Sequence, residues 1–211
     1  MDNINDNYLF IHIPKTAGRS IQKFLTNFPK HEHFSVYEQI NKIGEQEFLN
    51  KFKFTIVRNP WERMVSVWRF FGYNLGHDKI LNDLNDFNRW LNNHIKQSKN
   101  RKPYQKTPCQ QFSYLKNEKG EILIDYFIHF ENLNQDFIEL TQILKIDKPD
   151  NLKNIGKEEK FLMHHPNSKN QNQELVKKLA QNYKIAYENK ENIEIVAELE
   201  KEVIGKFGYK F

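Results

Sequence analysis

Two short stretches of the chain combine basic residues with hydroxyl groups and a proline, and each follows an apolar run. Residues 14–20 read PKTAGRS after YLFIHI at 8–13, and residues 58–66 read RNPWERMVS after KFTIV at 53–57. A helix that begins after such a loop offers unpaired N–H groups and the positive end of its dipole, to which a basic side chain adds charge. Both stretches therefore predict anion-binding sites.

The elements that must position these loops alternate between strands and helices. Apolar runs without polar alternation predict buried strands at 8–13, 53–58 and 122–130. Helical spacing predicts a helix that Pro29 ends, a helix from Pro60, and further helices over 83–97, 131–144 and 173–206, the last broken near Asn189. This order predicts an α/β fold: a single domain over residues 1–211, with a mostly parallel sheet flanked by helices.

The second loop indicates how its side chains would converge. Asn59 is a favourable N-cap residue, and Pro60 suits the first helical turn. With the tryptophans on the apolar stripe of that helix, Ser66 falls on the polar face, where it and Arg58 could share one phosphate. Open α/β sheets bind ligands at the carboxyl ends of their strands. Two anion sites at that edge predict one ligand with two separate anionic groups.

Composition limits the classes of protein. Of the 211 residues, 38% are hydrophobic and 28% charged, as in a soluble globular protein. A net charge of +5 and a pI near 9.0 favour an anionic partner, and nucleic acid, nucleotide and acidic polysaccharide all fit. Cys109 is the single cysteine, so no internal disulfide can form. The polar N-terminus lacks a signal-peptide pattern and no apolar run could span a bilayer, so we expect a cytoplasmic protein without membrane insertion.

The two loops match neither of the common nucleotide-binding motifs. G-x-x-x-x-G-K-[ST] and G-x-G-x-x-G are both absent, which disfavours an ordinary ATPase and a dinucleotide oxidoreductase. The loops instead resemble the donor-binding signatures of sulfotransferases that use 3′-phosphoadenosine 5′-phosphosulfate (PAPS). The resemblance is greatest to the carbohydrate branch, with its heparan sulfate 2-O and chondroitin-type enzymes and small bacterial relatives. In that family P-K-T-x-G-[TS]-[ST] cradles the 5′-phosphosulfate, and R-N-P-x-x-R-x-x-S holds the 3′-phosphate.

The resemblance assigns donor contacts to both loops. The first signature falls on Lys15, Thr16, Ala17, Gly18, Arg19 and Ser20, and the second on Arg58, Arg63 and Ser66. Arg19 stands where the family often has threonine or serine, and its role stays open. A weaker match continues through IDYFIHFENLNQDF at 124–137 and ends at FGYKF at 207–211. The family's late N-x-S segment, near the donor nucleotide, falls on Asn167 and Ser168, although an ordinary turn explains these two residues equally well.

The family also suggests the reaction and its base. The resemblance implies a P-loop-like sulfotransferase fold and transfer of the sulfuryl group from PAPS to a hydroxyl of a carbohydrate-type acceptor, without a metal. Lys15 would hold the leaving oxygen. The segment KHEHFSVYEQI at 30–40 resembles an H-x-H segment of the 2-O-sulfotransferases, whose second histidine is the base. This role carries onto His33, with His31 as its neighbour. An unperturbed imidazole titrates near pH ~6.5 and is mostly neutral at pH 7.

Structural interpretations of the same residues stay open. Lys15 could be a surface lysine, and Arg58 could form an ion pair with Glu62 or Glu38. Histidines in a polar segment usually have no function. The rival classes are a P-loop-type nucleotide kinase and a non-catalytic nucleotide- or RNA-binding protein, for which no recognition motif is present. We expect a glycan or another hydroxyl-bearing acceptor and no nucleic acid partner. The sequence does not identify the acceptor or the oligomeric state.

Overall fold

The computed structural model describes residues 7–25, 33–71, 84–98, 101–146 and 173–211. The chain divides into two compact units. The first consists of Met1–Arg58 and Lys102–Gly156, and the second of Asn59–Arg101 and Lys157–Phe211. Each unit is assembled from two separate stretches of the chain. A single domain over residues 1–211 therefore stays a prediction.

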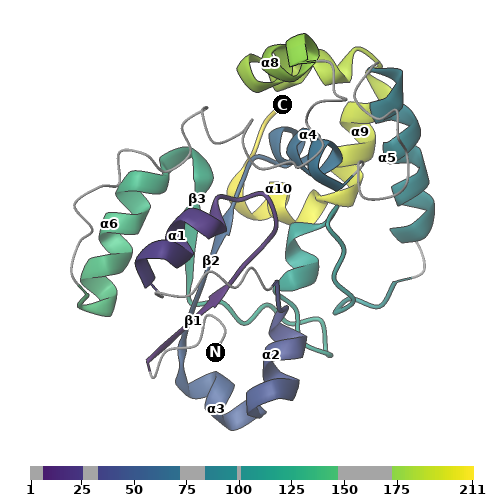
Figure 1. The fold of residues 1–211 in the computed structure, drawn as a ribbon. Coiled ribbons are helices and arrows are strands. Elements are labelled where there is room, and N and C mark those ends of the chain that lie inside the picture. Colours follow the sequence, from purple (N-terminus) through teal and green to yellow (C-terminus); the bar gives the residue numbers. More distant parts are fainter. Residues whose placement is uncertain (1–6, 26–32, 72–83, 99–100, 147–172) are drawn as a thin grey trace. The chain divides into compact units, whose positions relative to one another are not determined.

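A parallel sheet forms the centre of the first unit (Figure 1). Its strands are β1 (Tyr8–Ile11), β2 (Phe52–Val57) and β3 (Tyr126–His129), in the order β1-β2-β3. Both neighbouring pairs are parallel, so the three carboxyl ends lie at one edge of the sheet. This arrangement confirms the predicted α/β fold class with a parallel sheet.

Two strands are shorter than the apolar runs that predicted them. β1 ends at Ile11, because the residues after it leave the ladder and lead into the loop before the first helix. The run at 122–130 contributes only Tyr126–His129 to the sheet. Its first residues pair elsewhere, since Ile122 forms an antiparallel bridge with Lys116. The apolar runs thus located the strands but not their ends.

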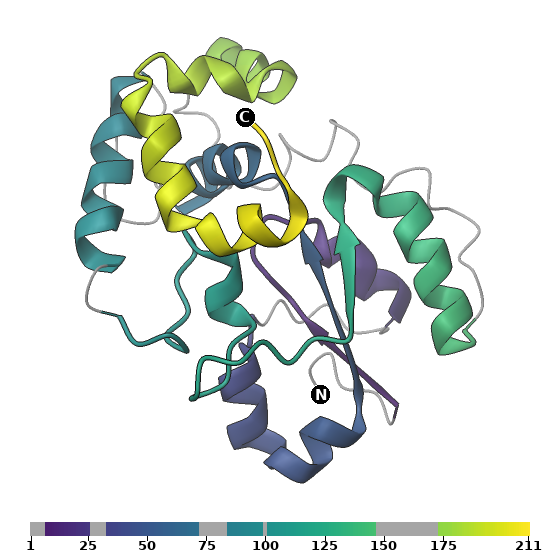
Figure 2. The same ribbon diagram turned by 180° about the vertical axis from the view of Figure 1, so that it is seen from behind.

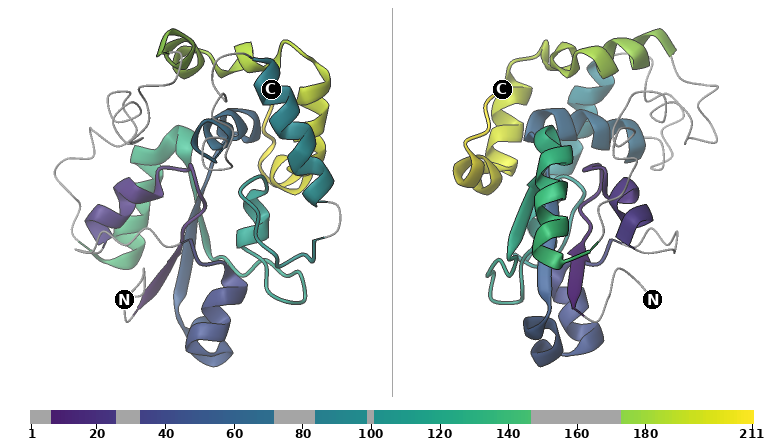
Figure 3. Two further views of the ribbon diagram at one scale, coloured as in Figure 1. Left: turned by 45° about the vertical axis from the view of Figure 1, so that its right-hand side comes forward. Right: turned by 90° about the vertical axis from the view of Figure 1, so that its left-hand side faces the viewer.

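Helices cover both faces of this sheet. They are α1 (Gly18–Leu25), α2 (Val36–Ile43), α3 (Glu45–Asn50), η2 (Gln111–Tyr114), η3 (Phe130–Asn132) and α6 (Leu133–Leu144). Figure 3 shows α1 and α6 on one side of the strands and η2 on the other. Ile21 of α1 and Phe137 of α6 share a buried core with Phe10, Phe54 and Ile128 of the strands. Burial on both faces explains why these strands read as continuous apolar runs.

The second unit is helical among its described residues. Its elements are α4 (Pro60–Phe71), α5 (Asn85–Ser98), α8 (Gln173–Gln181), η6 (Tyr183–Tyr187), α9 (Glu191–Leu199) and α10 (Lys201–Phe207). Figure 2 shows them from behind. α4 packs against α5, α9 and η6. The Asn59 side chain accepts hydrogen bonds from the backbone N–H groups of Trp61 and Glu62, at 3.1 and 3.2 Å, which confirms the predicted N-cap.

The predicted C-terminal helices and their break near Asn189 are present, but the helical run is also interrupted at Asn182 and Glu200, and residues 183–187 form a 3-10 helix. Helical structure resumes in α9 after Asn189, whose side chain accepts from the N–H of Glu191. The end that Pro29 was predicted to give α1 lies outside the described residues. None of the helices in the described ranges combines the length and the apolar character needed to cross a bilayer.

Candidate active site

The loop between β1 and α1 has an unusual backbone. Lys15 and Ala17 both have φ of 67°, in the left-handed region that non-glycine residues rarely adopt. Such residues cost free energy and occur mostly where a ligand site needs them. Turns of this kind direct backbone N–H groups into concavities that bind anions. The left-handed backbone at Lys15 and Ala17 is therefore compatible with the predicted phosphate loop, whose anion binding stays a prediction.

Thr16 holds this loop together. It is fully buried, and its hydroxyl donates a hydrogen bond of 2.8 Å to the carbonyl of Ile13. The hydroxyl proton is thus used within the chain, and a bound anion would have to be contacted by the Thr16 backbone N–H. The loop closes where the N–H of Ser20 donates to the carbonyl of Ala17 at 2.9 Å.

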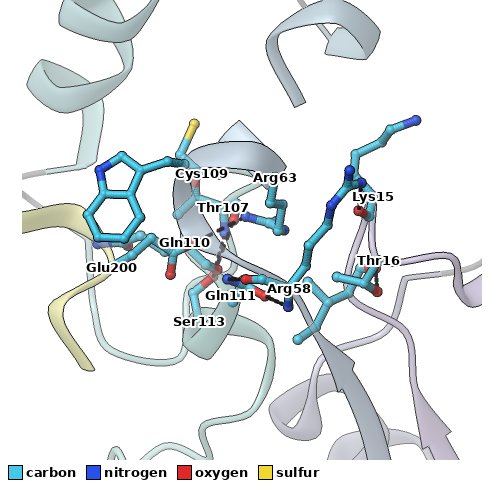
Figure 4. Close-up of polar contacts among 12 residues, drawn as sticks. Lys15, Thr16, Arg58, Arg63, Thr107, Cys109, Gln110, Gln111, Ser113 and Glu200 are labelled. Carbon is cyan, nitrogen blue, oxygen red and sulfur yellow. Dashed lines mark hydrogen bonds and ion pairs between the residues drawn. The ribbon is translucent and has the colours of Figure 1, made fainter. Parts of the chain in front are cut away.

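Arg58, directly after β2, reaches the same loop. One of its guanidinium nitrogens, Nη1, donates to the Lys15 carbonyl at 3.1 Å (Figure 4). The guanidinium carbon also lies 4.0 Å from the centre of the Phe130 ring, a cation–π contact. The two motifs that the sequence placed after separate strands therefore meet at the carboxyl edge of the sheet. Glu38, one of the two ion-pair partners that the sequence offered Arg58, pairs with Lys106 instead.

A buried glutamine fixes the backbone of Arg58. The side-chain amide of Gln111 accepts from the N–H of Arg58 and donates to its carbonyl, both at 2.9 Å. Gln111 is fully buried in η2, and Figure 4 shows its side chain beside Arg58. This two-point clamp holds the arginine where the strand ends. No local sequence pattern marks Gln111, because its partner lies 53 positions away.

Gly18, the first residue of α1, makes room for a buried histidine. A Cβ atom at this position would lie 2.1 Å from Cδ2 of His12. The His12 side chain is only 2% exposed and stacks on Phe10. The glycine of the PKTAG stretch is therefore required here by close packing against the chain itself.

Replacing Gly18 by alanine is expected to destabilise the protein by about 1–3 kcal/mol, the usual cost of overpacking. The added methyl group would meet a buried ring that cannot swing into solvent. Gly205→Ala in α10 is the matched control, since nothing lies within 4 Å of its added Cβ. That change should be neutral or stabilising by about 0.5–1 kcal/mol. Urea unfolding measures both, and equal effects would contradict this account of Gly18.

His33 lies beside this histidine. Its Nδ1 is 3.1 Å from the His12 carbonyl, and the two imidazole centres are 4.1 Å apart. A carbonyl can only accept, so the neutral His33 ring carries its proton on Nδ1, and Nε2 is the basic nitrogen. The predicted base thus lies beside His12, the residue that directly follows β1, at the same edge as the phosphate loop.

A lysine from the 101–107 segment holds the His33 main chain. Lys106 Nζ donates to the His33 carbonyl at 2.8 Å and to Oε2 of Glu38 at 2.6 Å. Partial burial raises the pKa of Glu38, but the hydrogen bonds from Lys106 and Ser35 outweigh it and lower that pKa below its ordinary value. The stability that this ionised carboxylate contributes is present above its unfolded-state pKa and is lost as the pH falls through the lowered value.

The third strand ends in a polar cluster with a structural role. The carboxylate of Asp136 accepts from the backbone N–H and from Nδ1 of His129, at 2.7 and 3.0 Å. The Asn132 side chain donates to its other oxygen. Asp136 is 7% exposed. It therefore ties the end of β3 to α6.

Two residues of the second signature belong to the second unit. Ser66 of α4 is buried, and its hydroxyl oxygen has no hydrogen-bond partner among the described residues. Arg63 is fully buried and forms an ion pair of 3.1 Å with the equally buried Glu200. Arg63, which the resemblance placed in a donor signature, thus has an ion-pair partner within its own unit.

The remaining predicted residues are less informative. Arg19 is exposed on α1, and Ser20 is half-buried. Asn167 and Ser168 lie outside the described residues, as does His31. His12, Gln111 and Lys106 belong to the site but were missed by sequence analysis. His12 looked like one more residue of an apolar run, and the other two act over long sequence distances.

The fold and the loop define a class of protein. A parallel α/β sheet whose first strand leads into a left-handed loop and a helix binds phosphate-like groups at its carboxyl edge. A family model described as the sulfotransferase family matches residues 3–188. The chain therefore belongs to the sulfotransferase family, a family of transferases, and the predicted sulfotransferase fold is confirmed. No curated protein and no solved structure matches the chain.

Proposed function

We propose that this sulfotransferase transfers the sulfuryl group of PAPS to a hydroxyl of a carbohydrate-type acceptor. The observation that carries the proposal is the meeting of three features at one sheet edge: the left-handed Lys15 loop, the Arg58 guanidinium and the imidazole of His33. Cationic groups and backbone N–H groups suit a donor with two anionic ends, and an imidazole suits a hydroxyl nucleophile.

The residues present fit this donor. The loop at residues 15–18 would receive the 5′-phosphosulfate, and the resemblance assigns 3′-phosphate contacts to Arg58 and to Ser66. A buried hydroxyl that lacks a partner is costly, and a ligand oxygen would satisfy Ser66. PAPS supplies an activated sulfuryl group when bound. Asn167 and Ser168 are proposed as further donor contacts on the resemblance alone, and Arg19 on its place in the first signature.

Two side chains of this protein would handle the proton and the charge of the transfer step. His33 Nε2 would take the proton of the acceptor hydroxyl as its oxygen forms the bond to sulfur. Lys15 would neutralise the charge that grows on the oxygen whose bond to sulfur breaks. The products are a sulfated acceptor and 3′,5′-ADP. Membership of the sulfotransferase family does not favour the alternative of a nucleotide kinase or a non-catalytic nucleotide- or RNA-binding protein.

The acceptor and the cellular location belong to the same proposal. The glycan class rests on the resemblance to the carbohydrate branch and not on a described contact. The cytoplasmic location rests on the sequence pattern alone. Transfer of labelled sulfate from PAPS into fractionated glycans, small phenols and tyrosine peptides, read by mass, tests the reaction and the acceptor together. Labelling of none of these, with an active reference enzyme in parallel, would contradict the proposal.

Ligand stabilisation separates the rival classes without an acceptor. A ligand that binds only the folded state stabilises it by RT ln(1 + L/Kd), where L is the free ligand concentration, and so raises the melting temperature more, the further that concentration exceeds Kd. We expect strong stabilisation by 3′,5′-ADP and little by ATP with magnesium. The opposite order would favour a nucleotide kinase.

Arg58→Ala is expected to weaken 3′,5′-ADP binding by about 1.5–3 kcal/mol, the value of a hydrogen bond to a charged group. Calorimetric titration measures this difference. Arg89→Ala on α5 is the matched control, because it removes the same charge from a side chain that is 72% exposed. Equal affinities of the wild type and Arg58→Ala would exclude Arg58 from the donor site.

A further inference from the structure

We propose that His12 is a positioning residue that keeps His33 in one orientation and one tautomer. The proposal rests on the proposed function, because it takes His33 as the base. His12 belongs to neither donor signature. It lies between the end of β1 and the loop that begins at Pro14.

The His12 imidazole is held by close neighbours. It stacks on Phe10, with ring centres 5.5 Å apart and ring planes 19° apart. Gly18 borders the ring so closely that a single methyl group there would overlap it. His12 is only 2% exposed, so its ring is held in place by the close packing of the interior.

The His33 ring packs against the His12 ring. The two imidazole centres are 4.1 Å apart, with an angle of 45° between the ring planes. The His12 carbonyl accepts from Nδ1 of His33 at 3.1 Å, which selects the tautomer with basic Nε2. Lys106 holds the His33 carbonyl at 2.8 Å. Rotation of the His33 ring would break the Nδ1 hydrogen bond and the ring contact together.

The same ring links the base to the phosphate loop. His12 touches His33 on one side and borders Gly18, the first residue of α1, on another. A fixed spacer of this kind would set the distance between the base and the bound sulfuryl group. Displacement of a reacting group by ~1 Å can lower a rate by on the order of 10²-fold. Loss of the ring should therefore affect turnover more than donor affinity.

A double-mutant cycle with His33 tests the positioning role. We expect His12→Ala to lower kcat by about 10–100-fold, with little change in 3′,5′-ADP affinity. In a His33→Ala background the same substitution should have almost no further effect on kcat, because no base remains to be positioned. His12→Phe keeps a ring on Phe10 and should recover most of kcat. Tyr8→Leu, a buried aromatic position on the same strand, is the control, and kcat should be unchanged in both backgrounds.

A spectroscopic readout needs no substrate. Nitrogen NMR of the ligand-free protein, labelled at its histidines, should show the proton of neutral His33 on Nδ1 in the wild type and in His12→Phe, and a mixture of tautomers in His12→Ala, where the ring that holds His33 against the His12 carbonyl is gone. A wild-type His33 with its proton on Nε2 overturns the proposal, whatever the variants do. So does an equal loss of kcat from His12→Ala in both backgrounds, or a folded His12→Phe that is as slow as His12→Ala. A wild type that transfers no sulfate refutes the proposed function, and the tautomer still decides how His33 is held.

Discussion

His33→Ala is expected to lower the turnover number by about 10²–10⁴-fold, the usual contribution of a positioned general base. The wild-type ring donates through Nδ1 to the His12 carbonyl, so Nε2 is the nitrogen that can receive the acceptor's proton. The phosphate loop and Arg58 are not changed by this substitution, so 3′,5′-ADP should bind with nearly the wild-type affinity. Initial rates with saturating PAPS and calorimetric titration measure the two quantities separately.

The pH profile and the neighbouring histidine provide controls. An imidazole accepts a proton only when it is neutral, so the wild-type rate should rise from acid to neutral pH through one ionisation that His33→Ala lacks. His31→Ala should have a milder effect. Near-normal turnover of His33→Ala would place the base elsewhere, with His31 or Glu38 as candidates. Glu38 is the weaker one, because Lys106 and Ser35 lower its pKa and so its basicity at neutral pH.

Local sequence patterns were sufficient to predict the strands and helices that carry the two loops. A continuous apolar run marks a strand buried on both faces, and the residues after it mark the loop at the sheet edge. The N-cap at Asn59 was readable because a cap depends on residues two and three positions away. Because parallel strands align their carboxyl ends, the meeting of the Lys15 loop and Arg58 also followed from the sequence.

One local signal was present but not used. Ser35 and Glu38 form a capping box at the start of α2, in which each side chain accepts from the other residue's backbone N–H. The S-x-x-E spacing at 35–38 indicates such a helix start. This spacing predicts α2 and places His33 two residues before its N-cap, in the segment that leads up to the helix.

Other features depend on contacts that no local pattern encodes. Arg63 matched a donor signature, yet its guanidinium pairs with Glu200, 137 positions away, in a fully buried contact. Lys106 reaches His33 and Glu38 across 73 and 68 positions. Long side chains with one charge pair with whatever the fold brings near. Their partners therefore become visible only in the structure.

Lys15→Ala is expected to lower the turnover number by about 10²–10³-fold, as the loss of one group that stabilises developing charge does. Charge on the leaving oxygen grows only as its bond to sulfur breaks, so the ammonium contributes more in the transition state than in the bound ground state. Affinity for 3′,5′-ADP should fall by less than turnover does. Initial rates at saturating PAPS and calorimetric titration of 3′,5′-ADP give the two values.

The backbone conformation at Lys15 allows the effect of losing the ammonium to be separated from an effect on the loop conformation. Its φ of 67° is strained for any L-residue, but Ala17 has the same φ two residues later, so alanine at Lys15 adds no strain beyond what the loop already accommodates. Lys15→Gly removes the ammonium and relaxes the backbone. Equal turnover in the alanine and glycine variants would therefore assign the loss to the ammonium, and unequal turnover to the loop conformation. Lys102→Ala, at an exposed lysine, controls for the loss of one positive charge. If Lys15→Ala weakens binding and turnover by the same factor, Lys15 only anchors the donor.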